Sequence, residues 1–171
     1  MFVAGRRREM EQVGRLLDRA TNGAGGLIVF FGPPGSGKTA MAEAAIDEAR
    51  GRGLDVLRAS PRASVQGRLA WAQMLRDTGA PDGLVASLLG DEAGPLDRDS
   101  AARHLVSGPA RLIVVDDVDR GGEDAVEMLS FVAARSAAAG AAVIATAAAP
   151  LGLGTELPLA GLSEADLAAV L

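Results

Sequence analysis

Short apolar segments alternate along the chain with longer segments in which apolar positions recur every three or four residues. The short segments have the pattern of strands buried on both faces of a sheet. They lie at 26–31, 54–59, 111–116, 142–146 and, less clearly, 156–159. The periodic segments predict amphipathic helices at 7–21, 38–50, 64–78 and 123–138. Strands that alternate with helices indicate an α/β fold. We expect a three-layer sandwich with a central, mainly parallel sheet of about five strands and helices on both faces.

Two parts of the chain are harder to interpret. Residues 79–110 are rich in Gly and Pro, so only short helices are expected there, near 83–89 and 98–106. A last helix is expected from Ser163, because Ser163 and Asp166 have the spacing of a capping box. That helix has hardly begun when the sequence ends. We therefore expect one domain over residues 1–171, as a fragment of a larger protein or a truncated gene product.

The strongest chemical signal lies between the first strand and the helix that follows it. The segment Gly32-Pro33-Pro34-Gly35-Ser36-Gly37-Lys38-Thr39 fits the pattern G-x-x-x-x-G-K-[ST] at every position. Small residues let successive backbone N–H groups surround a phosphate, and the helix adds its positive N-terminal end. We expect Lys38 to reach the β- and γ-phosphate oxygens and the Thr39 hydroxyl to ligate magnesium, with Ala40 beside them. The motif thus predicts a P-loop that binds ATP or ADP with Mg²⁺.

Lysine usage supports this interpretation. The chain has sixteen arginines and a single lysine, and that lysine is Lys38. A planar guanidinium is bulkier than an ammonium group and would fit a tight phosphate-binding loop poorly. A chain that otherwise uses Arg therefore keeps Lys where the phosphate chemistry favours it.

Polar residues follow two of the predicted strands. The aliphatic strand before Asp116 and Asp117 predicts that Asp116 holds the magnesium hydration shell. Asp117 is expected to orient or deprotonate the attacking water, so Lys38 and Asp117 are the candidate catalytic residues; a plain strand-end role remains open for Asp117. Thr146, at the end of the fourth strand, either contacts the γ-phosphate or is a plain strand-end residue.

The composition limits which classes of metal site and binding partner are expected. There are no cysteines, which excludes disulfides and thiolate metal sites. The net charge is −5, so a broad basic face is not expected. Arg6-Arg7-Arg8 is interpreted as a solvated helix start, with a phosphate or partner contact as the alternative. We expect no nucleic-acid contact from this segment. Apolar runs are too short to cross a bilayer, and we expect no membrane contact and a cytoplasmic location.

Together these segments resemble the nucleotide-binding domain of STAND-type ATPases, and most closely the N-terminal AAA-type ATPase domain of large LuxR-type bacterial transcriptional regulators. Residues 2–10 are similar to that family's F-V-G-R-E-x-E-L segment, which packs on adenine and ribose. The resemblance implies that Val3, Gly5 and Arg6 bind the nucleotide. It also matches Gly32–Thr39 to Walker A and 114–118 to Walker B. It implies that the family's C-terminal lid and effector domains are missing from residues 1–171.

One departure from that family bears on catalysis. The family often ends its fourth strand with T-x-R, whereas this chain has Thr146-Ala147-Ala148. The arginine expected near the γ-phosphate is therefore absent, and no Lys or Arg follows Arg135. Arg120 is the nearby alternative, and its neighbours Gly121 and Gly122 lead us to expect a loose placement.

The sequence leaves three functions open. The first is a regulatory switch that binds ATP with magnesium and hydrolyses it slowly, as a weak ATPase. The second is a nucleotide-binding assembly module without useful hydrolysis, acting through self-association or other protein domains. The third is a small-molecule kinase. It is disfavoured because kinases usually carry an Arg-rich mobile lid late in the chain, where this sequence has no Arg.

Overall fold

A computed structural model describes residues 5–60 and 67–161 of the chain. Its elements agree with the predicted ones to within a few residues, apart from a 3-10 helix that the pattern did not indicate. In chain order they are α1 (Arg7–Thr21), β1 (Gly26–Phe31), α2 (Lys38–Gly51), β2 (Asp55–Ala59), α3 (Gly67–Asp77), α4 (Asp82–Leu89), α5 (Pro95–Val106), β3 (Arg111–Val115), the 3-10 helix η2 (Val118–Gly121), α6 (Gly122–Ser136), β4 (Ala141–Ala147) and β5 (Thr155–Pro158).

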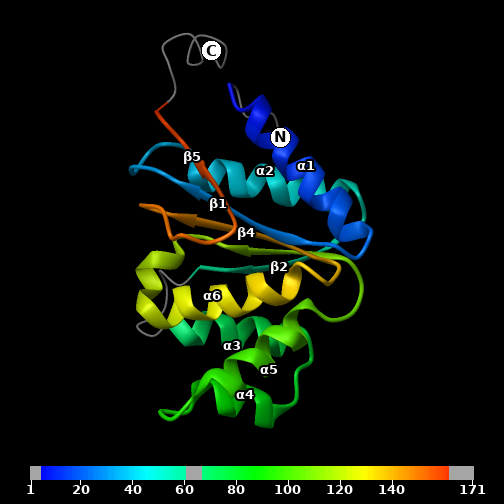
Figure 1. The fold of residues 1–171 in the computed structure, drawn as a ribbon, viewed down its shortest axis with the longest axis vertical. Helices are drawn as coiled ribbons and strands as arrows, with labels where there is room; N and C mark the ends of the chain where they lie inside the picture. The colour runs from blue at the N-terminus through cyan, green and yellow to red at the C-terminus, as the bar shows by residue number, and fades with distance from the viewer. Residues whose placement is uncertain (1–4, 61–66, 162–171) are drawn as a thin grey trace.

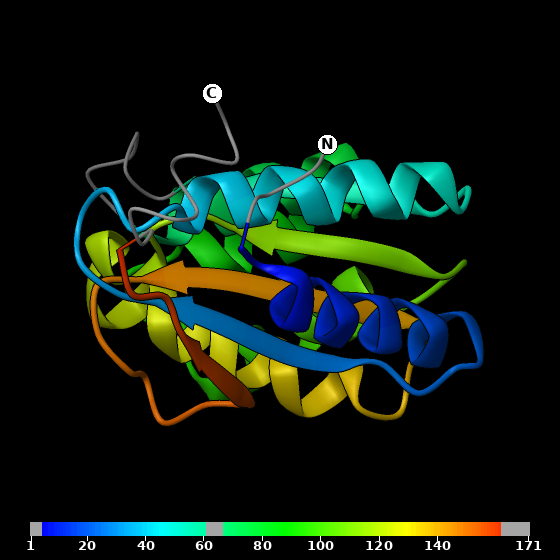
Figure 2. The ribbon, with the colours of Figure 1, turned by 90° about the horizontal axis from the view of Figure 1, so that it is seen from above.

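The five strands form one parallel sheet in the order β2-β3-β4-β1-β5. The strand that leads into the predicted P-loop, β1, pairs with β4 and β5. The strand that ends before Asp116, β3, pairs with β2 and β4. Because all the strands point the same way, the residues that follow β1, β3 and β4 meet at one edge of the sheet (Figures 1 and 2). That edge is where ligands bind in open α/β sheets.

Helices cover both faces of the sheet, as predicted. Alternate strand residues, among them Ile28, Phe30 and Val114, point to the face covered by α1 and α2. Their neighbours, among them Val29 and Val115, join the larger core beneath α3, α5 and α6. Figure 1 shows α4 and α5 farther from the sheet than α3 and α6, so residues 82–106 add packing outside the three layers.

Local chemistry sets the ends of several helices. Gly51 is still helical, and Gly53 adopts the left-handed backbone that follows the end of α2. The helix α5 begins at Pro95, earlier than predicted, because the Asp97 carboxylate accepts the Gly94 N–H at 2.9 Å.

Two predicted features fall partly or wholly outside the described residues: the start of the 64–78 helix and the helix from Ser163. Within the described ranges, no helix is long and apolar enough to span a membrane.

Candidate functional site

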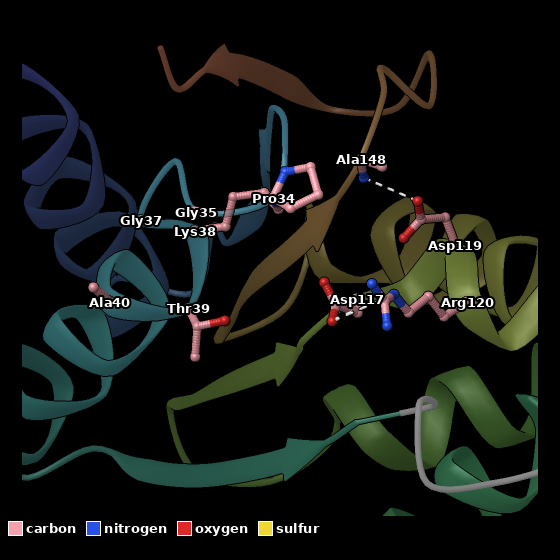
Figure 3. A pocket seen from close by; sticks show the side chains of 10 residues that line it. All are labelled: Pro34, Gly35, Gly37, Lys38, Thr39, Ala40, Asp117, Asp119, Arg120 and Ala148. Atoms are coloured by element: carbon pink, nitrogen blue, oxygen red, sulfur yellow. Dashed lines mark hydrogen bonds and ion pairs between the residues drawn. The ribbon is translucent and has the colours of Figure 1, made fainter. Parts of the chain in front are cut away.

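A pocket of about 310 Å³ lies at the edge of the sheet where β1, β3 and β4 end (Figure 3). Its wall combines the predicted phosphate-binding loop with the turn that follows β3 and the residue that follows β4. The lining residues are Pro34, Gly35, Gly37, Lys38, Thr39, Ala40, Asp117, Asp119, Arg120 and Ala148. The fold therefore brings together three segments that are far apart in sequence.

Glycine is needed in the loop for two different reasons. At Gly32 a Cβ atom would stand 2.4 Å from the carbonyl oxygen of Leu159, so no side chain fits there. Gly35 and Gly37 have φ angles of 80° and 88°, which favour glycine, and no atom lies within 4 Å of where their Cβ would stand. The loop thus presents open backbone to the pocket, as a phosphate-binding cradle requires.

Lys38 is held inside this loop. Its Nζ atom donates hydrogen bonds to the carbonyl oxygens of Gly32 and Pro33, at 2.8 and 2.9 Å. The residue is buried, yet it lines the pocket. The only lysine of the sequence therefore places its positive charge at the mouth of the cradle.

The side of the loop away from the pocket is held by Arg6. Its Nη2 atom donates to the Ser36 carbonyl at 3.2 Å and to the Ala160 carbonyl. Its Nη1 atom forms an ion pair with Glu9 at 3.3 Å. We expected Arg6 to bind nucleotide, but its guanidinium is buried in these contacts and does not line the pocket.

The other two residues of the predicted N-terminal segment add little to the described site. Gly5 is exposed beside Arg6 and is not among the residues that line the pocket. Val3 lies outside the described residues. The predicted contact of this segment with the nucleotide therefore stays a prediction.

Asp116 is buried and held by two threonine hydroxyls. Thr39 Oγ1 lies 3.4 and 3.2 Å from its two carboxylate oxygens, Oδ1 and Oδ2. Thr146 donates to Asp116 Oδ1 at 2.6 Å and accepts the backbone N–H of Asp117 at 2.7 Å. Thr146 is fully buried and does not line the pocket. Two roles are therefore open for Thr146: positioning the two aspartates, and the predicted contact with the γ-phosphate. This geometry favours the first.

Asp117 turns the chain as it leaves the sheet. It has a left-handed backbone (φ 53°), unusual outside glycine, and it begins η2. Its buried side chain lines the pocket, and Oδ2 lies 3.8 Å from Arg120 Nε. A carboxylate in this position is suited to contact a water molecule beside a bound phosphate.

Two residues that line the pocket, Asp119 and Arg120, were not assigned to the site from the sequence. Asp119 accepts the backbone N–H of Ala148 at 2.9 Å and so joins the turn after β3 to the end of β4. Arg120, expected to be loosely placed, belongs to the pocket wall. The contact between Asp117 and Arg120 has no signal in the sequence, because it depends on the left-handed backbone of Asp117.

The donor set fits a magnesium ion. The described residues contain no group of three or more His, Cys, Asp or Glu side chains that could hold a metal by themselves. Mg²⁺ needs no such group, because it keeps several waters and commonly binds through one or two protein groups together with substrate phosphates. The Thr39 hydroxyl, at the pocket, and the Asp116 carboxylate behind it are groups of that kind.

Comparison with known families agrees with this geometry. Residues 3–144 match the family described as the AAA ATPase domain. The chain belongs to that family. No curated protein sequence matches the chain. The family defines a nucleotide-binding ATPase fold, which is consistent with the loop and the parallel sheet described above.

Solved structures share the fold at low sequence identity. Orc1 of Aeropyrum pernix, in complex with DNA, has a TM-score of 0.72 and 16% identity, over 99% of this chain and 48% of that one. Cdc6p of Pyrobaculum aerophilum has a TM-score of 0.70 and 13% identity, over 99% of this chain and 48% of that one. AMPPCP-bound DnaA of Aquifex aeolicus has a TM-score of 0.53 and 18% identity, over 92% of this chain and 48% of that one. The chain thus spans about half the length of these proteins, and the likeness shows the fold.

The expectation of no nucleic-acid contact from this segment was wrong. Orc1, which the chain resembles in fold over nearly its whole length, is in complex with DNA, and so is ORC of Drosophila, with a TM-score of 0.68 and 19% identity, over 97% of this chain and 44% of that one. The net charge of −5 is a sum over the whole chain, so it does not by itself exclude a local contact with nucleic acid. A net charge does not show where local basic groups lie, such as the exposed Arg7 and Arg8.

Proposed function

We propose that the chain binds ATP or ADP with Mg²⁺ in this pocket and hydrolyses ATP slowly, as the switch domain of a STAND-type regulatory ATPase. The proposal is carried by one observation above all: Lys38, Thr39 and Asp116 converge where three parallel strands end, beside an open glycine loop. The sequence resemblance to the ATPase domain of LuxR-type regulators supports the regulatory part of the proposal.

Binding would use the loop, the lysine and the metal together. The backbone N–H groups at 35–39 would surround the β-phosphate, with the N-terminal end of α2 behind them. Lys38 would contact β- and γ-phosphate oxygens as a point charge. Magnesium, when bound, supplies positive charge that neutralises the phosphates. Thr39 would be its protein ligand, and Asp116 would hold the water of its hydration shell.

Hydrolysis would proceed by attack of water in line with the leaving group. The water oxygen forms a bond to the γ-phosphorus, and the bond from that phosphorus to the β–γ bridging oxygen breaks. The electron pair of the broken bond stays on ADP, and the Asp117 carboxylate accepts the proton lost by the water. Asp117 lines the pocket beside the loop, which supports this role.

A second candidate is a nucleotide-binding assembly module without useful hydrolysis, acting on other protein chains or on nucleic acid. Ala148 favours it, because an alanine lines the pocket where the resembling family often has an arginine. The fold likeness to Orc1 in complex with DNA also favours it. A turnover measurement separates the two candidates, since only the switch hydrolyses ATP at a rate above the uncatalysed reaction.

The binding site itself is tested by Lys38→Ala. We expect the affinity for ATP with magnesium, measured by calorimetric titration, to fall at least about 100-fold, since a charge-assisted contact contributes about 1.5–3 kcal/mol and Lys38 makes more than one. Arg103→Ala is the matched control, because Arg103 is an exposed cation of α5 outside the pocket. Equal affinity in Lys38→Ala and the parent chain would refute the site.

A further inference from the structure

Arg120 brings a second cation to the pocket, from the side opposite the loop. Figure 3 shows its side chain reaching from η2 toward the Asp117 carboxylate. Among the residues that line the pocket, Lys38 and Arg120 are the two basic ones. Lys38 is fixed by loop carbonyls, whereas the Arg120 side chain is 57% exposed. The pocket thus combines one buried cation with one that is free to change position.

The backbone that carries Arg120 is firmly held. The Arg120 N–H donates to the Asp117 carbonyl at 3.0 Å, and Val118 between them is fully buried. The Asp119 carboxylate ties the same turn to Ala148. The glycines at 121 and 122 therefore do not loosen the placement of Arg120, contrary to the sequence-based expectation. The backbone hydrogen bond from Arg120 to Asp117 closes a turn that keeps the two residues close together.

The contact between Arg120 and Asp117 is easily exchanged. Its Nε–Oδ2 separation is 3.8 Å, longer than a hydrogen bond, and more than half of the arginine side chain is exposed. An ion pair at this separation, with a largely exposed arginine, contributes little to stability. A guanidinium binds phosphate oxygens through paired, charge-assisted hydrogen bonds, which are stronger. A triphosphate in the pocket would therefore compete well for this arginine.

We propose that Arg120 is a catalytic residue that moves from Asp117 to the γ-phosphate oxygens of bound ATP. The movement stabilises the negative charge that develops on the transferred phosphoryl group. Arg120 thereby supplies, from within the chain, the cation that is absent at Ala148. This inference rests on the proposed function, since it requires ATP in the pocket.

The test compares triphosphate and diphosphate binding in Arg120→Ala, Arg120→Lys and the parent chain. Calorimetric titrations with ATP–Mg and ADP–Mg give the ratio of the two affinities. We expect Arg120→Ala to lose about tenfold or more in ATP affinity, because it lacks a charge-assisted phosphate contact. Its ADP affinity should change by less than about threefold, since ADP has no γ-phosphate for Arg120 to contact. Arg120→Lys keeps the charge without the paired geometry and should lie between.

Single-turnover phosphate release supplies the second readout. It should fall at least about 100-fold in Arg120→Ala, since arginines that contact a transferred phosphoryl group contribute factors of about 10³–10⁵. Arg103→Ala is the matched control: Arg103 is 64% exposed, is paired with an aspartate of its own helix at 2.7 Å, and lies outside the pocket. It should match the parent chain in both assays.

The outcomes separate the two proposals. If the parent chain binds ATP and Arg120→Ala keeps the parent's ratio of ATP to ADP affinity, Arg120 does not contact the γ-phosphate and the inference is overturned, while the proposed function stands. If both affinities fall together with the melting temperature, Arg120 has a structural role and the inference is again overturned. A parent chain that binds no nucleotide overturns both proposals.

Discussion

The buried hydroxyl of Thr146 is expected to hold both aspartates of the site in place. In Thr146→Val the side chain keeps nearly the same shape but loses its donor and acceptor. The bond to the Asp116 carboxylate, at 2.6 Å, is charge-assisted and contributes about 1.5–3 kcal/mol. The Asp117 N–H, at 2.7 Å, would remain buried without its acceptor, at a cost of about 1–3 kcal/mol. We therefore expect a loss of about 2.5–6 kcal/mol in the free energy of unfolding, or about 5–24 °C in melting temperature for a chain of this size.

Urea denaturation measures this loss, and Thr146→Ser is the matched control. Serine keeps the hydroxyl and removes one buried methyl group, which costs about 1 kcal/mol. Thr146→Val should also weaken the magnesium-dependent part of ATP binding, because Asp116 loses one of its two threonine donors. If the valine variant is as stable as the serine variant, the hydroxyl does not hold the aspartates and the reasoning fails.

Three further predictions concern the pocket. ATP with magnesium at a hundred times its dissociation constant should stabilise the folded chain by about 2.7 kcal/mol, seen as a higher melting temperature than with ATP and chelator; no shift in either condition would argue against a working site. Asp116→Asn should weaken magnesium-dependent binding, whereas Asp117→Asn should mainly slow phosphate release in a steady-state assay, and unchanged release would remove Asp117 from catalysis. Gly32→Ala should destabilise the chain in a thermal melt, because its Cβ would meet the Leu159 carbonyl at 2.4 Å, and a melting temperature like the parent's would contradict that close approach.

The elements around the loop could be predicted because their signals are local. The strand at Gly26–Phe31 and the helix at Arg7–Thr21 have the bounds expected from their apolar patterns. A buried parallel strand is a continuous aliphatic run, and a glycine motif directly after one has few other structural uses. The α/β class and the phosphate-binding loop follow from such patterns without knowledge of any long-range contact.

The contacts between segments could not be predicted in the same way. The sequence does not reveal that β4 lies between β1 and β3, and this strand order is what places Thr146 beside Asp116. Similarly, the sequence does not reveal that Arg6 donates to the Ser36 and Ala160 carbonyls, which are 30 and 154 residues away in the chain. The position of Arg120 depends on the left-handed backbone of Asp117, and such a conformation has no reliable signal outside glycine.

The contacts behind the loop also bear on nucleotide affinity. Arg6 and the segment at 159–160 hold the loop through residues that do not line the pocket. Arg6 donates to the Ser36 and Ala160 carbonyls, and the Leu159 N–H donates to the Phe31 carbonyl at 2.7 Å. Ordering the backbone of one flexible residue costs about 1–2 kcal/mol. A loop that is already ordered by folding does not subtract that entropy from the free energy of binding. Weakening the Arg6 contacts would thus lower affinity for a phosphate ligand while every side chain that lines the pocket stayed the same.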